Sequence, residues 1–182
     1  MAKIEELSYY SEGKNIIIRN AALEDAQRLV ELMKKLDTET TFLLREPEEF
    51  TLTVEQEQKF IETKLESQVE LFLLAEVDGE IIGSCAVNGS TRKRLRHTGN
   101  LGIALTEKYW GLGIGRKLME TAIAWAKENG ITRVTLEVDT SNFRAISLYT
   151  RLGFQVEGTF INDKRLGDGS YRNGYAMALL LF

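Results

Sequence analysis

The sequence predicts a mixed α/β fold built around one β-sheet. About seven short apolar segments are typical of strands, and four segments have the i, i+3, i+4 apolar spacing of helices. Asp78-Gly79 separates two of the apolar segments and is typical of a tight hairpin turn. The elements follow the order β-α-α-β-β-β-α-β-α-β-β, which favours a mixed sheet over a doubly wound parallel one.

The first half of the chain is expected to hold four strands and two helices. Three consecutive isoleucines, Ile16 to Ile18, indicate a strand that is buried on both faces. A T-x-x-Q capping box at residues 53–56 opens the second helix. The expected elements are a polar extension at 1–14, a strand at 15–20, a helix at 23–36, an irregular stretch at 37–52, a helix to about 67, strands at 69–77 and 80–88, a basic loop at 90–96 and a strand at 101–105.

In the second half, two helices are expected to alternate with three strands. Gly130 and Gly153 follow apolar-periodic segments and are well placed to end helices in the left-handed conformation. The expected elements are a helix at 117–129, a strand at 131–139, a helix that opens at Asn142, and strands at 154–160 and 171–182.

Length and composition indicate one globular domain over residues 1–182. Apolar residues make up 43% and charged residues 27%, and no run of about 18 apolar residues suggests a membrane span. The single cysteine, Cys85, excludes an internal disulfide and a cysteine-rich zinc site, so no metal is expected. The net charge of −4 argues against nucleic acid as a partner. We therefore expect a cytoplasmic protein that binds neither nucleic acid nor membranes.

A glycine-rich turn between a strand and a helix is the most informative segment. Residues 110–118 read WGLGIGRKL, with Gly111, Gly113 and Gly115 alternating with bulky residues. Glycine lets the backbone approach a ligand closely, and the unpaired amides and dipole of a helix start attract anions. Arg116 stands where the dinucleotide and P-loop patterns both need glycine, so neither pattern fits. The turn predicts a phosphate-bearing ligand of another kind.

A second motif lies about thirty residues further on. Asn142, Ala145, Tyr149 and Leu152 are spaced +3, +4 and +3, so they share one helical face that ends at Gly153-Phe154. Together, the two motifs resemble the GCN5-related N-acetyltransferase (GNAT) superfamily over roughly residues 15–182. In that superfamily a (Q/R)-x-x-G-x-(G/A) loop precedes an N-x-x-A-x-x-x-Y-x-x-x-G-F segment. Trp110 departs from the family pattern, because it stands where Gln or Arg is usual.

The resemblance implies a mostly antiparallel sheet with helices on both faces, which splays between its fourth and fifth strands. It also implies acetyl-CoA as co-substrate. The loop amides would hold its pyrophosphate, and the open edge of the fourth strand would pair with its pantetheine arm. The residues implied in binding are Ile103, Ala104, Leu105, Trp110, Gly111, Leu112, Gly113, Ile114, Gly115, Arg116, Lys117, Asn142, Ala145 and Tyr149.

Two catalytic residues follow from the resemblance. The N–H of Leu105 or its neighbour would stabilise the oxyanion, and Tyr149 would protonate the leaving thiolate, a task that suits a phenol with a pKa near 10. Asn142 is expected to bind the cofactor, with helix capping as the alternative. The proton acceptor is left open among His97, Glu107, Glu137, Asp139 and a water relay.

The implied activity is direct acetyl transfer to a primary amine of a small molecule or a peptide or protein N-terminus. A non-catalytic acyl-CoA sensor is the alternative, and a homodimer is left open. The irregular stretch at 37–52 is expected to cover the acceptor entrance, with Glu48 and Glu49 attracting a cationic amine.

Overall fold

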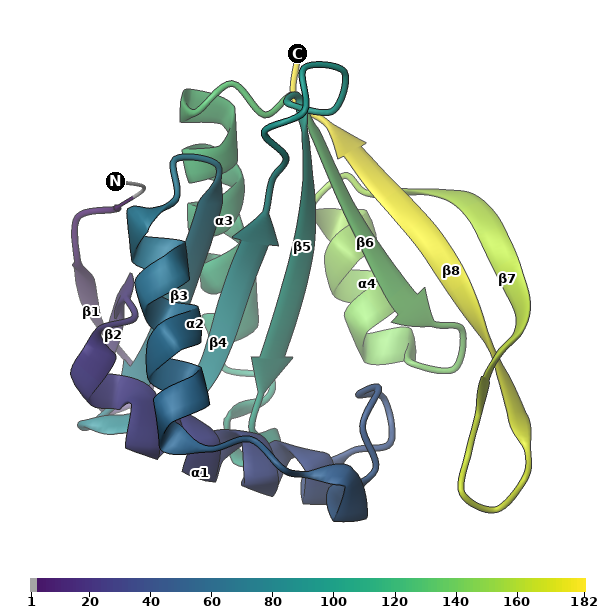
Figure 1. Cartoon of the computed structure of the whole chain (residues 1–182), viewed down its shortest axis with the longest axis horizontal. Coiled ribbons are helices and arrows are strands. Elements are labelled where there is room, and N and C mark those ends of the chain that lie inside the picture. Colours follow the sequence, from purple (N-terminus) through teal and green to yellow (C-terminus); the bar gives the residue numbers. More distant parts are fainter. Residues whose placement is uncertain (1–2) are drawn as a thin grey trace.

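The computed structural model describes residues 3–182, and this part of the chain contains one eight-stranded sheet (Figure 1). The strands lie in the order β1-β2-β3-β4-β5-β6-β8-β7, and every neighbouring pair is antiparallel except β5 and β6. Their bounds are β1 Leu7–Ser11, β2 Lys14–Asn20, β3 Glu70–Val77, β4 Glu80–Asn88, β5 Thr98–Leu105, β6 Arg133–Asp139, β7 Gln155–Arg165 and β8 Tyr171–Leu180.

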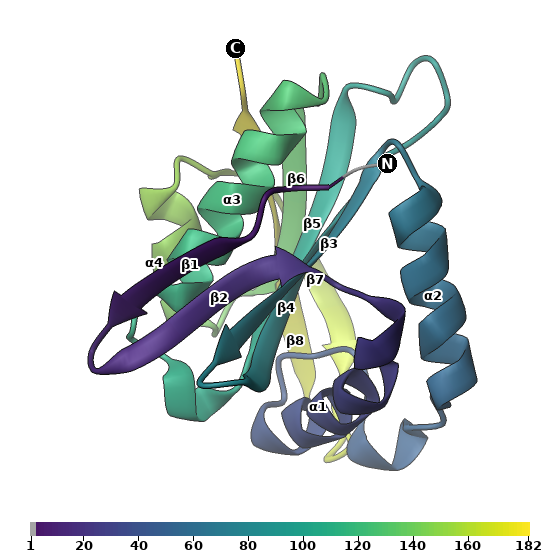
Figure 2. The ribbon, with the colours of Figure 1, turned by 90° about the vertical axis from the view of Figure 1, so that its left-hand side faces the viewer.

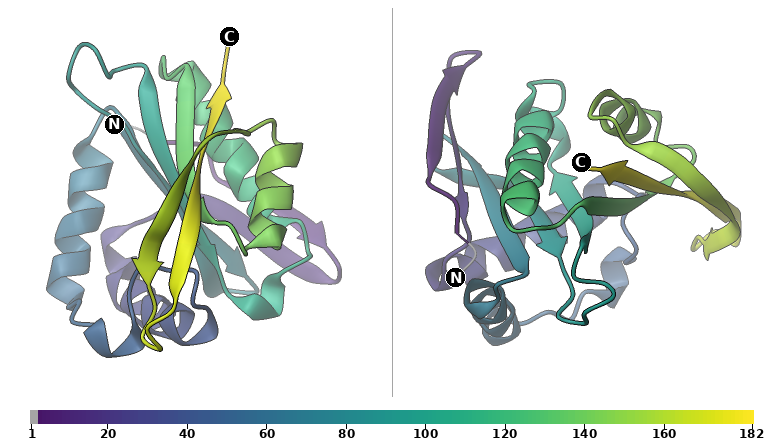
Figure 3. Two further views of the ribbon diagram at one scale, coloured as in Figure 1. Left: turned by 90° about the vertical axis from the view of Figure 1, so that its right-hand side faces the viewer. Right: turned by 90° about the horizontal axis from the view of Figure 1, so that it is seen from above.

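Helices cover both faces of the sheet. Those on one face are α1, Ala26–Glu39, and α2, Val54–Glu66, while α3, Ile114–Glu128, and α4, Phe143–Arg151, lie on the other (Figures 2 and 3). Three short 3₁₀ helices connect them: η1 Leu23–Asp25, η2 Pro47–Glu49 and η3 Glu107–Tyr109. None of the helices in residues 3–182 combines the length and apolar character that a bilayer crossing requires.

Each face of the sheet has its own hydrophobic core. The apolar stripe of α3, with Leu118 and Ala122 fully buried, packs against one face of β3 to β6 together with Tyr149 of α4. The stripe of α1, with Leu29 and Leu36, packs against Phe72 and Leu74 on the other face. Removing these side chains from water is the main source of stability for such layers.

The sheet opens between its two parallel strands, as the resemblance implies. β5 and β6 pair only at Thr98 to Asn100, opposite Arg133 to Thr135, whereas β5 pairs with β4 along its whole length to Leu105. Figure 1 shows the two strands together at the top and diverging downward. One edge of β5, from Leu101 to Leu105, is therefore free; we call it the free edge.

The structure corrects several expected bounds. The polar stretch at 1–14, of which residues 1–2 lie outside the described part, contributes an unexpected strand, because β1 pairs with β2 from Leu7 to Ser11. α3 begins at Ile114, not Lys117, since Gly113 already occupies the N-cap position. The final hairpin is also longer than expected: β7 continues to Arg165.

Candidate active site

The glycine turn leaves six consecutive backbone amides without a protein partner. Gly111 and Gly113 have φ of 84° and 77°, a conformation that glycine adopts without strain. In the described part of the chain, the N–H groups from Gly111 to Arg116 donate to no protein acceptor, whereas Lys117 N–H bonds to the Gly113 carbonyl. These amides and the positive end of the α3 dipole form a site that suits a phosphate group.

A cavity of about 980 Å³ runs from this turn through the opening between β5 and β6 to the α1/α2 face. Twelve of the residues expected at the cofactor line it: Ile103, Ala104, Leu105, Trp110, Gly111, Gly113, Ile114, Gly115, Arg116, Asn142, Ala145 and Tyr149. Leu112 and Lys117 do not line it; Leu112 packs against the hydrophobic core. The volume is at the upper end of the range for ligand pockets, so it can hold parts of two molecules.

The free edge of β5 presents unpaired backbone groups to this cavity. Thr106 N–H bonds to Ile82 on the β4 side. Backbone groups alternate between the two edges of a strand, so those of Ile103 and Leu105 point the other way, toward the opening. An extended ligand can therefore pair with β5 there as an added strand would.

Trp110 is hydrogen-bonded to the end of the free edge of β5. Its indole N–H donates to the Leu105 carbonyl, with 2.7 Å between nitrogen and oxygen. The guanidinium of Arg144 in α4 lies 5.2 Å from the centre of the Trp110 ring, a cation–π contact. Trp110 thus links the end of β5 to the start of α4 through a contact specific to the indole ring.

Tyr149 lies in α4 with its side chain 8% exposed, lining the cavity. Burial, with a smaller contribution from Cys85, raises its pKa to about 12. The phenol therefore keeps its proton throughout the neutral range. This protonation state is the one that a proton donor requires.

Asn142 caps α4, because its side-chain oxygen accepts from the Ala145 N–H at 3.1 Å. The capping alternative is thus observed for this oxygen. Asn142 is also among the residues that line the cavity. Its contact with the cofactor stays a prediction.

The four candidate proton acceptors lie in different places. His97 is exposed and precedes β5, so a strand of about 25 Å separates it from the glycine turn. Glu107 is also exposed and lines only a smaller cavity. Glu137 and Asp139 of β6 line the large cavity. In residues 3–182 no group of three or more His, Cys, Asp or Glu side chains is placed to hold a metal ion.

Glu137 and Asp139 differ in their surroundings. Asp139 is buried, which opposes its ionisation, but hydrogen bonds from Ser141 and an ion pair with Arg172 outweigh burial and lower its pKa. Glu137 is exposed to the cavity and forms no hydrogen bond or ion pair within the described residues. Its carboxylate is free to accept a proton.

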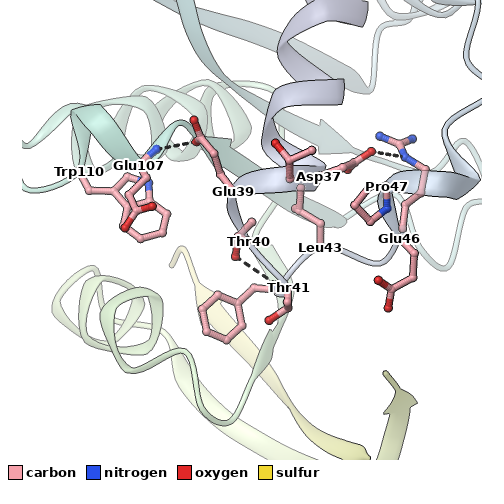
Figure 4. A pocket seen from close by; sticks show the side chains of 12 residues that line it. Asp37, Glu39, Thr40, Thr41, Leu43, Glu46, Pro47, Glu107 and Trp110 are labelled. Atoms are coloured by element: carbon pink, nitrogen blue, oxygen red, sulfur yellow. Dashed lines mark hydrogen bonds and ion pairs between the residues drawn. The ribbon is translucent and has the colours of Figure 1, made fainter. Parts of the chain in front are cut away.

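The irregular stretch between α1 and α2 lines a second cavity of about 460 Å³ beside the first (Figure 4). Asp37 is buried and bonded to Arg45, while Glu39 accepts from the Glu107 N–H at 2.9 Å. Glu46 also lines this cavity, whereas Glu48 and Glu49 line neither one. The attraction of an amine by Glu48 and Glu49 stays a prediction, while the acidic residues that line this cavity are Asp37, Glu39, Glu46 and Glu107.

Sequence reasoning missed Arg144 and Arg151 of α4, which both line the large cavity. The position of Arg144 in the sequence could have marked it as a site residue. A cation in the first turn of a helix is disfavoured by the helix dipole, so its presence there indicates an anion or another compensating contact.

The fold of this chain is shared with acetyltransferases of known structure. An acetyltransferase of the GNAT family from Streptococcus pneumoniae is similar with a TM-score of 0.87 and 34% identity, over 91% of this chain and 99% of that one. YncA from Salmonella typhimurium, solved with acetyl-CoA, has the same fold with a TM-score of 0.81 and 21% identity, over 92% of this chain and 95% of that one.

The sequence comparisons place the chain in one family. The model of the acetyltransferase (GNAT) family matches residues 29–154, and the chain belongs to this family of acyltransferases. An N-alpha-acetyltransferase from Sulfurisphaera tokodaii is 31% identical over 159 residues, 82% of this chain and 86% of that protein. The L-amino acid N-acetyltransferase AaaT of Escherichia coli is 30% identical over 110 residues, 58% of this chain and 65% of that protein.

Proposed function

We propose that the chain transfers an acetyl group from acetyl-CoA directly to a primary amine of a small molecule or of a peptide or protein N-terminus. The observation that carries this proposal is the continuity of one cavity. It begins at the six free amides of the glycine turn, passes the free edge of β5 and Tyr149, and ends on the opposite face of the sheet. A donor and an acceptor can thus meet from the two faces.

The amides from Gly111 to Arg116 would hold the pyrophosphate of acetyl-CoA. Arg144 would add positive charge beside them. Arg116 already contacts Glu120, with 2.8 Å between Nε and the carboxylate, and is largely exposed, so its contribution to phosphate binding would be smaller. Ile103 would bind the pantetheine arm through its backbone N–H and carbonyl, which point to the free edge.

Acetyl-CoA supplies the acetyl group as a thioester. The Leu105 N–H, on the free edge, would stabilise the negative charge that develops on the carbonyl oxygen when the neutral amine attacks. As the C–N bond forms and the C–S bond breaks, the sulfur takes the electron pair. The Tyr149 hydroxyl would then donate its proton to the sulfur.

Glu137 would accept the proton that the amine loses. It lies on β6 across the opening from β5, and its carboxylate has no competing protein partner in residues 3–182. Asp139 is less suited to this role, because its carboxylate already accepts from Ser141 and contacts Arg172.

Release of free CoA thiol tests this proposal. Purified protein is incubated with acetyl-CoA and a panel of amines and short peptides, and thiol release and the acetylated product are both measured. Amine-dependent release supports a transferase. Binding of acetyl-CoA without release for any amine would favour the non-catalytic acyl-CoA sensor.

A further inference from the structure

The end of the large cavity on the α1/α2 face is lined by apolar side chains. Met33 and Leu36 come from α1, Phe60 from α2 and Phe72 from β3. The Phe60 and Phe72 rings meet edge to face, with centroids 5.4 Å apart. Phe60 is nevertheless 40% exposed and lines the cavity, while the Lys64 ammonium lies 5.0 Å from the centre of its ring. An open aromatic surface of this kind is suited to an apolar ligand group.

Polar side chains also line this end of the cavity, among them Ser84 of β4, Asn100 of β5 and Glu137 of β6. Val134, Leu136 and Val138 are buried in the core with α3, so the alternating Glu137 points to the α1/α2 face. Glu137 is thus on the same side of the sheet as Phe60 and Phe72, in the same cavity. The ammonium group of a ligand near Glu137 would have a carboxylate partner, and an apolar group of the same ligand near Phe60 would have an apolar contact.

Basic side chains at this end already have acidic partners. Lys164, which lines the cavity, has its Nζ 3.1 Å from Asp163. Arg172 lies outside the lining, 3.4 Å from Asp139, and stacks on the lining residue Phe42. A substrate carboxylate would have to compete with these pairs. Apolar contact, and not carboxylate recognition, is therefore the basis on which this end can select an acceptor.

We propose that the acceptor is a primary amine whose neighbouring carbon carries a bulky apolar side chain, bound by Met33, Phe60 and Phe72. The inference rests on the proposed acetyl transfer and specifies its acceptor. A free amino acid, its amide and a peptide N-terminus all share this chemistry. Only the free amino acid carries a carboxylate next to the amine.

The test compares phenylalaninamide and leucinamide with glycinamide, and adds free phenylalanine and a peptide that begins with phenylalanine. We expect wild-type kcat/KM to be at least about tenfold higher for the bulky amides than for glycinamide, because buried apolar groups discriminate on this scale. The amide and the peptide should exceed free phenylalanine.

Two variants connect this preference to the cavity. Phe60→Ala should raise KM for phenylalaninamide about tenfold and leave glycinamide unchanged, and Ala86→Leu, which fills the cavity from β4, should do the same. Phe160→Ala is the matched control, since Phe160 is 42% exposed on β7 and lies outside the cavity lining.

The outcomes distinguish failure of the apolar acceptor from failure of the proposed acetyl transfer. Equal efficiency for glycinamide and phenylalaninamide, or equal effects of Phe60→Ala and Phe160→Ala, would overturn the apolar acceptor while acetyl transfer stands. Absence of turnover with every amine would contradict the proposed function and this inference with it.

Discussion

The indole N–H of Trp110 donates to the carbonyl of Leu105 across 2.7 Å, at the end of the free edge of β5. Leu105 is the residue whose N–H is proposed to stabilise the oxyanion, so Trp110 holds the last residue of the strand in place. The ring also supports Arg144 through a cation–π contact.

We expect Trp110→Phe to lower kcat up to about tenfold with a smaller change in acetyl-CoA affinity. The variant keeps an aromatic ring but leaves the Leu105 carbonyl without its donor, a loss of about 1 kcal/mol. Steady-state kinetics and calorimetry measure the two quantities. Trp125→Phe is the control: Trp125 is buried in α3, so this change should lower stability and spare kcat. Wild-type kcat in Trp110→Phe would show that the bond has no positioning role.

Tyr149→Phe should lower kcat about 10²- to 10⁴-fold, the usual contribution of a general acid, while acetyl-CoA affinity changes little. Only the hydroxyl is removed, and the ring still packs against Phe154. Single-turnover kinetics with the best acceptor measures the effect. A variant that works at the wild-type rate would make Tyr149 a packing residue.

Glu137→Gln should reduce kcat/KM at neutral pH about 10²-fold or more, because the amide cannot accept the amine proton. Asp139→Asn should chiefly lower stability, since its carboxylate binds Ser141 and Arg172. Glu107→Gln, outside the large cavity, is the matched control. Equal activity of Glu137→Gln and Glu107→Gln would favour a water relay as the proton acceptor.

Stability should fall as pH rises from about 9 toward 12. Burial raises the pKa of Cys85 from 9.0 to about 12 and that of Tyr149 from 10.0 to about 12. The unfolded chain therefore releases these protons first, so the stabilisation is complete below pH 9 and lost as pH passes through the folded-state values. Urea unfolding at pH 8 and pH 11 measures the change. Tyr149→Phe should lose about 1 kcal/mol less than wild type at pH 11. An identical loss in both would contradict burial of the phenol.

Much of the fold could be predicted because its elements carry local signals. The Asp78-Gly79 turn, the capping box at Thr53 and the apolar stripe of α3 all reappear in the structure. Strand β1 could not be predicted, since Leu7 to Ser11 has an intermediate and exposed pattern and is held chiefly by pairing with β2. Its stability is a property of the sheet and not of the segment.

The candidate site, like the fold, has parts that could be predicted from the sequence and parts that could not. The glycine turn and the Tyr149 helix could be predicted from spacing along the chain. The proposed proton acceptor could not, because no local pattern tells which of Glu137, Glu107 and His97 lines the large cavity once the chain is folded. The hydrogen bond from Trp110 to Leu105 could not be predicted from the sequence either, since it depends on how η3 folds the chain back onto the end of β5.

Binding of acetyl-CoA to Gly113→Val, measured by calorimetry, tests the central claim most directly. The matched control is Gly130→Val, because Gly130 ends the same helix with φ of 78° against 77° at Gly113, and a Cβ at either position meets no atom within 4 Å. Both variants carry the same backbone strain, but only Gly113 lines the cavity. The account predicts that Gly113→Val loses acetyl-CoA affinity at least about tenfold relative to Gly130→Val. Equal affinity in the two folded variants would contradict binding of the cofactor at the glycine turn.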